Sequence, residues 1–285
     1  MKCPHCNQEH PDNYQYCPET GEKIELFKAC NNPSIPEFGK QIVPTDRKNC
    51  PSCGQSMEGA LPTEPIDILA HLDFQLDEVV KHRLVFIKGN QSLPDFYISE
   101  TPITQGLWNL ITNMKDIIKN TASGRGVYNP MFSVSLQDAE YFIDKLNEYF
   151  IEGMRKTIVF KEYTIKKFAL PTENQWEYVA CEGGKNNLKY SGSDNIDDVA
   201  WYKENSDSHI HEVKTKKPNA LGVYDMCGNV AEWCQYDSYY GCIARGGSWD
   251  DNENACRIDS RKSLSSKNYS ASTIGFRIVL LLERR

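Results

Sequence analysis

Most apolar residues of this chain fall in short runs interrupted by glycine, proline and asparagine, whereas two longer stretches show helical spacing. These stretches are QGLWNLITNMKDIIKN (105–120) and VSLQDAEYFIDKLNEYF (134–150), whose apolar residues recur at intervals of three and four. Ser135, near the start of the second stretch, is a candidate N-cap, because its hydroxyl can accept from a free amide of the first turn. We predict two core-facing helices, the second of them capped by Ser135.

The short apolar runs after residue 84, such as LVFIKG and FYISETPIT, are typical of strands and tight loops. Before them, prolines give way to apolar residues at helix-like spacing bounded by acids, which predicts a linker with one short helix. The pattern divides the chain into a head (1–56), this linker (57–83) and a large domain (84–285). An irregular α+β layout is expected for the large domain.

The composition is that of a folded protein, since 40% of the 285 residues are hydrophobic and 25% are charged. The net charge of −7 disfavours nucleic acid as a main partner, because sequence-independent binding needs clustered Lys and Arg. No stretch approaches the ~18 apolar residues of a membrane span, and the start MKCPHCNQEH offers no export signal. We therefore expect a cytoplasmic protein with no membrane partner.

Six of the eleven cysteines lie within the first 53 residues, where a reducing environment favours metal binding over disulfides. They are Cys3, Cys6, Cys17, Cys30, Cys50 and Cys53. The CPHC and CPSC pairs have the two-residue spacing that presents two sulfurs to one tetrahedral zinc ion. The zinc is expected to be structural, because such a site contributes about 10 to 16 kcal/mol and can replace a small core.

The head resembles a pair of zinc ribbons that have each lost one cysteine, with Thr20 where the fourth sulfur of the first ribbon would stand. Two pairings stay open. One has two three-sulfur sites, the first of them completed by His10, and the other has a single four-sulfur site made from the two intact pairs. Tethering or dimer contact is a further hypothesis for this head.

Five segments of the large domain, taken in order, carry a family signature. They are ETPITQGLW (100–108), NPMFSVSLQDAEYF (129–142), FALPTENQWEY (168–178), NALGVYDMCGNVAEW (219–233) and RGGSWDDNENACR (245–257) with IGFR (274–277). Together they resemble the formylglycine-generating, or sulfatase-modifying, enzyme family. The resemblance implies a loop-rich α+β fold related to C-type lectins. The many glycines of these segments fit such a fold, because its loops bend tightly.

Members of that family bind calcium in the loop that corresponds to DMCGNVAE, and the resemblance places the ligands at Asp225, Gly228, Val230 and Glu232. The chemistry agrees, since calcium takes about six to eight oxygens and two carboxylates supply part of that set. The alternative is that both acids accept hydrogen bonds from backbone amides of a tight loop. Calcium is the expected structural cofactor at this loop.

In the oxidases of the family, two cysteines after the GGS sequence bind a copper ion that activates oxygen. Asp251 and Cys256 hold those positions here, and a single thiolate cannot build that site. Ala231 stands where the family has a tryptophan and Ala255 where it has a tyrosine, whereas Ser248 is kept. Copper is therefore not expected, and Cys256 is predicted to be a buried thiol. An oxidoreductase with an altered metal site is the alternative.

If the fold is kept without those ligands, the surface around the GGS loop is predicted to bind a protein or a small polar ligand. The stretch 249–273 is rich in Asp, Asn, Ser and Tyr, which combine adaptable hydrogen bonds with rigid aromatic contacts. Its candidate contact residues are Trp249, Asp250, Asp251, Asn252, Asn254, Asp259, Lys262 and Tyr269. A retroelement-diversified variable protein, or an ordinary polar loop, would have the same composition. The principal interpretation is a noncatalytic binding module with a zinc-stabilised head.

Overall fold

The computed structural model describes residues 28–29, 42–43, 67–75, 80–112, 124–185 and 187–285. All six cysteines of the expected zinc head lie outside these ranges, so the zinc prediction concerns a part of the chain beyond the fold described below. Within the described ranges, no helix combines the length and the apolar character needed to cross a membrane.

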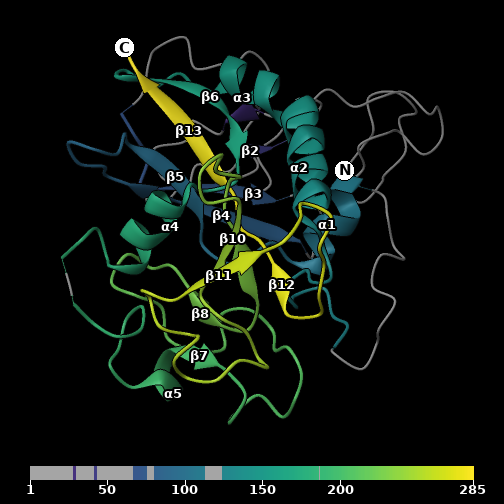
Figure 1. The fold of residues 1–285 in the computed structure, drawn as a ribbon. Coiled ribbons are helices and arrows are strands. Elements are labelled where there is room, and N and C mark those ends of the chain that lie inside the picture. The colour runs from purple at the N-terminus through teal and green to yellow at the C-terminus, as the bar shows by residue number, and fades with distance from the viewer. Residues whose placement is uncertain (1–27, 30–41, 44–66, 76–79, 113–123, 186) are drawn as a thin grey trace.

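The largest element is a seven-stranded sheet with the order β1-β2-β3-β4-β5-β13-β6 (Figure 1). Its strands are β1 (Lys28–Ala29), β2 (Ile42–Val43), β3 (His71–Gln75), β4 (Lys81–Ile87), β5 (Phe96–Ser99), β13 (Val279–Arg284) and β6 (Tyr163–Ala169). The last strand, β13, lies between β5 and β6 and is antiparallel to both. The IGFR segment (274–277), one residue away from β13, is buried in the interior.

The helices are α1 (Gln105–Thr112), α2 (Leu136–Leu146), the π-helix η1 (Asn147–Ile151), α3 (Glu152–Thr157), α4 (Glu173–Ala180) and α5 (Ile196–Val199). The predicted cap of α2 is confirmed. The Ser135 hydroxyl accepts from the Asp138 amide at 3.1 Å, and the Asp138 carboxylate accepts from the Ser135 amide at 2.8 Å. Both predicted helices are present, the first described as far as Thr112 and the second continuing into η1.

Both faces of the large sheet are covered, as the alternation along β4 makes plain. Leu84 and Phe86 pack into one cluster together with α1 and α2. Val85 and Ile87 point to the opposite face and pack with α4. Successive strand residues face opposite sides, so a single apolar run contributes to two cores. Figure 1 accordingly shows α1 and α2 on one side of the sheet and α4 on the other.

The predicted linker helix is wrong where the structure describes that segment, because residues 71–75 and 81–83 belong to β3 and β4. The two strands are antiparallel, with Leu72 opposite Leu84 in the core. Asp73 and Arg83, also opposite each other, form an ion pair of 2.6 Å. Cross-strand pairing thus outweighs the helix-like spacing, and the large domain begins before residue 84.

A second sheet has the order β11-β10-β9-β12. Its strands are β11 (Arg261–Leu264), β10 (Cys242–Arg245), β9 (Ala231–Trp233) and β12 (Ile274–Gly275), while β7 (Ala200–Trp201) and β8 (Cys227–Gly228) form a separate pair. Loops make up much of the remaining described chain, and Figure 1 shows them gathered around β7, β8 and α5, away from the C-terminus. The predicted loop-rich α+β fold is confirmed.

Candidate functional site

Two loops meet beside the small sheet, namely residues 246–260 after β10 and residues 225–230 before β9. The Gly228 amide donates to the Gly246 carbonyl at 2.8 Å and so ties the two loops together. Gly247 has a φ of +68°, and a Cβ at this position would come within 2.7 Å of the Cys256 sulfur. Glycine is required at residue 247, because a side chain would be strained and would also clash.

Cys256 is a buried free thiol, as predicted, with 0% of its surface exposed. Its sulfur lies 3.9 Å from the Ser248 carbonyl oxygen, to which it donates. Burial raises the pKa of the Cys256 thiol above its usual range. The thiolate is the form that attacks electrophiles and binds metals, so this sulfur is held in its unreactive form.

Asp251 stabilises the loop through two polar contacts. Its carboxylate accepts from the Ser248 hydroxyl at 2.5 Å and lies 3.6 Å from the Lys262 ammonium. A carboxylate is a hard ligand that suits Cu(I) poorly. Of the two positions where the resemblance implies aromatic residues, Ala231 is fully buried in β9 and Ala255 is partly buried. The polar contacts of this loop therefore serve its own conformation.

The predicted contact residues divide into an exposed and a supporting group. Exposed side chains are those of Asp250, Asn252, Asn254, Asp259 and Tyr269. Asp251 and Lys262 are half-buried and contact each other. Trp249 is buried, and its indole N–H donates to the Ser272 carbonyl at 3.1 Å, so it supports the loop from beneath. We call the exposed group, together with Lys262, the loop face.

A tyrosine-rich turn between β9 and β10 was not predicted from the sequence. Tyr236, Tyr239 and Tyr240 are 46%, 86% and 55% exposed. The Asp237 carboxylate orders this turn by accepting from the amides of Tyr239 and Tyr240 at 2.7 and 2.9 Å. The available signal was the sequence QYDSYYG, in which three aromatic residues stand among polar ones with no apolar residue to pack against.

Asp225 is the residue of the expected calcium loop that fits a cation. Its side chain is buried, its φ is +54°, and one carboxylate oxygen accepts from the Lys214 amide at 2.9 Å. Burial raises the pKa of Asp225 to about 6, and Arg277 and Asn229 lower it only in part. Among the described residues, no cationic side chain forms an ion pair with it. A buried carboxylate without a paired cation is costly, which favours a bound ion.

Glu232 fits calcium less well, because a cation of the chain already neutralises it. Its two oxygens lie 2.6 and 2.7 Å from the Arg277 guanidinium, and the Trp176 indole N–H donates to one of them at 2.7 Å. Both partners of this ion pair are buried. Across the described ranges, no group of three or more His, Cys, Asp or Glu side chains is arranged around a common point. Calcium here would depend on Asp225 and on backbone oxygens.

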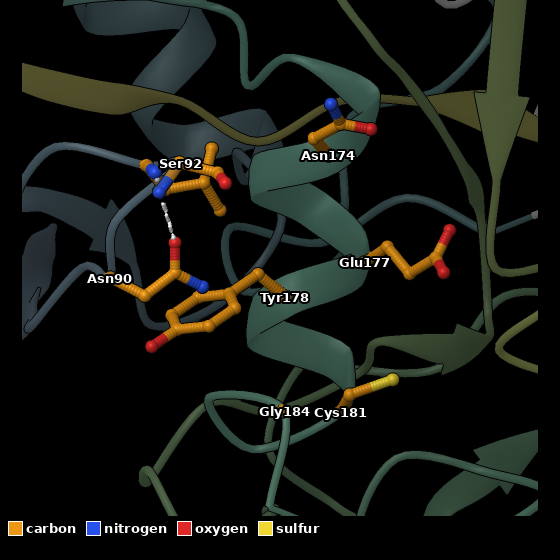
Figure 2. Close-up of a pocket in the computed structure, with 8 residues that line it drawn as sticks. Asn90, Ser92, Asn174, Glu177, Tyr178, Cys181 and Gly184 are labelled. Atoms are coloured by element: carbon orange, nitrogen blue, oxygen red, sulfur yellow. Dashed lines mark hydrogen bonds between the residues drawn. The ribbon is translucent and has the colours of Figure 1, made fainter.

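A hollow of about 320 Å³ lies between α4 and the turn that joins β4 to β5 (Figure 2). Figure 2 shows the hydrogen bond in which the Asn90 side-chain oxygen accepts from the Ser92 backbone amide. The distance between the two atoms is 2.8 Å. The Tyr178 hydroxyl donates to a carbonyl of the turn, and Glu177 accepts from Arg245 at 2.5 Å. These bonds tie α4 to its neighbours, and the predicted site residues lie elsewhere.

The sequence of this chain matches a known protein family. A model of the sulfatase-modifying factor enzyme 1-like domain matches residues 74–282. The chain belongs to this family. The family match begins within β3, which agrees with a domain that starts before residue 84.

The relatives of this chain include a protein named as a chaperone and a protein named as an enzyme. The chaperone protein LppX of Paenibacillus barcinonensis is 31% identical over 215 residues, which cover 59% of this chain and 74% of that protein. The formylglycine-generating enzyme of Streptomyces coelicolor is 28% identical over 143 residues, which cover 38% of this chain and 45% of the enzyme. The similarity thus spans less than half of the enzyme's length.

A solved structure, that of Treponema denticola variable protein 1, has a similar fold. Its TM-score is 0.60 at 25% sequence identity, and the alignment covers 74% of this chain and 98% of that protein. Nearly the whole of that protein's fold therefore has a counterpart in this chain.

Proposed function

We propose that this chain is a noncatalytic binding module on the sulfatase-modifying factor fold, with the loop face as its contact surface. The observation that carries the proposal is the state of Cys256, whose thiol is fully buried and whose pKa is raised by burial. Asp251, at the other ligand position, is hydrogen-bonded to Ser248. A soft metal cannot take two thiolates from such a loop. The exposed residues above it are free to contact a partner.

The proposed partner is a protein or a small polar ligand. The exposed Asp and Asn side chains of the loop face supply adaptable hydrogen-bonding groups, and backbone turns order the loop before binding. The Ala255 amide donates to the Asn252 carbonyl at 3.1 Å, and the Cys256 amide donates to the Glu253 carbonyl at 3.2 Å. An ordered loop loses less conformational entropy on association. The similarity to a protein named as a chaperone supports a protein partner.

Capture of partners from a lysate of the native host tests this function. The full chain is compared with a loop-face variant, Asp250→Ala/Asn254→Ala, and with a control variant, Gln91→Ala/Asp144→Ala, whose altered residues are exposed on other elements. A species captured by the wild type and the control but lost from the loop-face variant is the expected result. Equal capture by all three proteins would contradict the proposed surface.

Zinc in the head and calcium at Asp225 belong to the same proposal. The six cysteines would hold the zinc, while Asp225 with backbone oxygens of Gly228 and Val230 would hold the calcium, which the unpaired buried carboxylate supports. Metal analysis of the purified full chain should find zinc and calcium without copper or iron. The Cys3→Ser/Cys6→Ser variant should lose zinc and keep calcium. Stoichiometric copper that disappears in Cys256→Ala would favour the oxidoreductase alternative.

A second function is favoured by the similarity to a protein named as variable. In that case residues 249–273 would differ among closely related copies, while the buried residues beneath them stay fixed. Sequencing of the neighbouring DNA tests this. A near-identical repeat that differs at adenines, next to a reverse transcriptase gene, is the expected arrangement, and a locus without both would leave a binding module of fixed sequence.

A further inference from the structure

Strand β11 is the open edge of the small sheet. It is the outermost strand in the order β11-β10-β9-β12 and pairs with β10 alone. Within the described chain, no backbone group of another segment bonds to its outer side. Its residues alternate between exposed and half-buried. A row of free backbone groups on an exposed edge is a template for pairing with another strand.

The direction of the backbone groups in β10 follows from one hydrogen bond. The Cys234 amide donates to the Ile243 carbonyl at 2.9 Å, so Ile243 bonds toward β9. In an antiparallel sheet, successive residues of a strand bond to opposite sides. Cys242 and Ala244 therefore bond in the other direction, toward β11.

The pairing of β10 with β11 shows which residues of β11 bond to β10. The partners of Cys242 and Ala244 are Leu264 and Lys262, so these two residues use their backbone groups within the sheet. By the same alternation, Arg261 and Ser263 direct their N–H and C=O groups outward. Two donors and two acceptors of the main chain thus face away from the sheet, at the spacing of a strand.

Strand β6, the edge of the large sheet, shows how this protein closes an edge. The Asn147 side chain donates to the Phe168 carbonyl at 3.0 Å and accepts from the Phe168 amide at 2.7 Å. The Arg155 guanidinium donates to the carbonyls of Ile165 and Lys166. Side chains thereby occupy backbone groups that would otherwise pair with another strand. Within the described chain, β11 has no such cap.

The tyrosine-rich turn lies against β11. The Arg261 guanidinium stands 4.5 Å from the Tyr240 ring, and the Tyr240 and Tyr239 rings make an edge-to-face pair at 4.8 Å. Arg261 is at the same time held by both oxygens of Glu173, at 2.6 and 2.7 Å. The Tyr240 ring is thus held beside β11, and both rings remain exposed. Exposed tyrosines supply contact area at a low entropic cost.

We infer that an extended, uncharged segment of a partner protein adds to β11 as a fifth strand and packs against Tyr239 and Tyr240. Main-chain hydrogen bonds to a sheet edge and side-chain contacts beside it are the two parts of this mode of peptide recognition. Arg261 is paired with Glu173, and Lys262 lies near Asp251. Because both cations already have an acidic neighbour, the partner segment needs no acidic residues. This inference rests on the proposed function and names its partner class.

A second copy of this chain fits the edge less well. If two β11 strands paired antiparallel, the Arg261–Glu173 and Lys262–Asp251 pairs of both copies would have to fit beside one ladder of four residues. An uncharged segment from a different protein avoids this crowding.

The test uses a display library of random peptides of about 12 residues, selected on the full chain. Ser263→Pro removes an outward N–H without touching the ladder to β10, and proline is tolerated at such edge positions. Ser263→Ala is the matched control, because it keeps that N–H. Selected peptides should bind Ser263→Pro at least about tenfold more weakly than wild type, and Ser263→Ala within about twofold. Equal thermal midpoints of the two variants exclude a folding defect.

Hydrogen exchange gives an independent readout of the same contact, since the Ser263 amide should exchange more slowly when a selected peptide is bound. Peptides that bind all three proteins equally, but fail on Asp250→Ala/Asn254→Ala, would overturn the strand addition and leave the loop face intact. Selection of no peptide, or concentration-dependent dimers that Ser263→Pro abolishes, would also overturn it. The lysate capture decides separately whether the proposed function holds.

Discussion

The inner and outer sides of the loop 246–260 differ in what they offer to another molecule. On the inner side, Ser248 and Cys256 are fully buried and Trp249 packs beneath the loop. On the outer side, Asp250 and Asn254 are exposed. Copper chemistry of the family would need the inner side, whereas recognition needs the outer one. The comparison teaches that the buried residues of this loop serve its packing, whereas its exposed residues are available to another molecule.

The largest expected effect concerns the ion pair in the interior between the loops. Arg277→Ala should lower the free energy of unfolding by about 3 to 5 kcal/mol, because it leaves the buried Glu232 carboxylate without its cation. Arg284→Ala is the matched control. Its pair with Glu162 is exposed, so the loss should stay below about 1 kcal/mol. Chemical denaturation measures both, and equal losses would contradict the structural role of the interior pair.

The next effect is a pH dependence at Asp225. Its folded pKa of about 6 lies above the unfolded value of ~3.9, so protonation favours the folded state. The protonated Asp225 carboxyl group contributes its full stabilisation of the folded state below about pH 4. This contribution is lost as the pH rises through 6, and the loss in the free energy of unfolding amounts to about 3 kcal/mol. Asp225→Asn should therefore gain stability over the wild type between pH 4 and pH 7.5 when a chelator is present.

Added calcium gives a second way to compare the wild type with Asp225→Asn. At pH 7.5 it should raise the thermal midpoint of the wild type and leave that of Asp225→Asn nearly unchanged, because the amide supplies no charge. Thermal unfolding of both proteins with calcium and with chelator gives the four values needed. Wild-type and variant curves that run parallel across pH and calcium would refute the assignment of Asp225.

A smaller effect separates two free thiols. Cys256→Ala should cost about 1 to 2 kcal/mol, because it removes a fully buried sulfur and leaves a small cavity. Cys181→Ala, at the half-buried C-cap of α4, should cost under about 0.5 kcal/mol. In the native protein an alkylating reagent should modify Cys181 well before Cys256. Modification of Cys256 first would mean that the inner side is open.

The smallest effect on stability is expected on the outer side. Asn254→Ala should change the free energy of unfolding by less than about 0.5 kcal/mol, because the side chain is exposed. Its capture of host proteins should nevertheless fall. Denaturation and capture are measured on the same preparation, and a variant that unfolds more easily but captures normally would reverse the division between the two sides.

Local signals in the sequence predicted the parts of the fold that depend on neighbouring residues. Ser135 before an apolar run predicted the capped α2, and the order of five segments predicted the loop-rich fold. The residues 71–75 were mistaken for part of a helical linker, because the pairing that makes them a strand comes from β4. Contacts between distant residues have no local signature.

In the candidate site, too, contacts between distant residues could not be predicted from the sequence. The burial of Cys256 was predicted from the replaced ligand positions, whereas Trp249 was expected on the surface and lies beneath the loop. The pairing of Glu232 with Arg277 joins segments 45 residues apart and was not foreseen. The open edge of β11 depends on the order of strands in a sheet, which the sequence alone does not state.

Oxidation of a cysteine-containing peptide tests the central claim most directly. The full chain, loaded with Cu(I) and supplied with oxygen and a reductant, is incubated with the peptide, and mass spectrometry follows conversion of its cysteine to formylglycine. Catalysis through Cys256 requires a reactive thiolate and a second soft ligand, so we predict no conversion above that of a Cys256→Ala control. Multiple turnover by the wild type that is lost in Cys256→Ala would contradict the account.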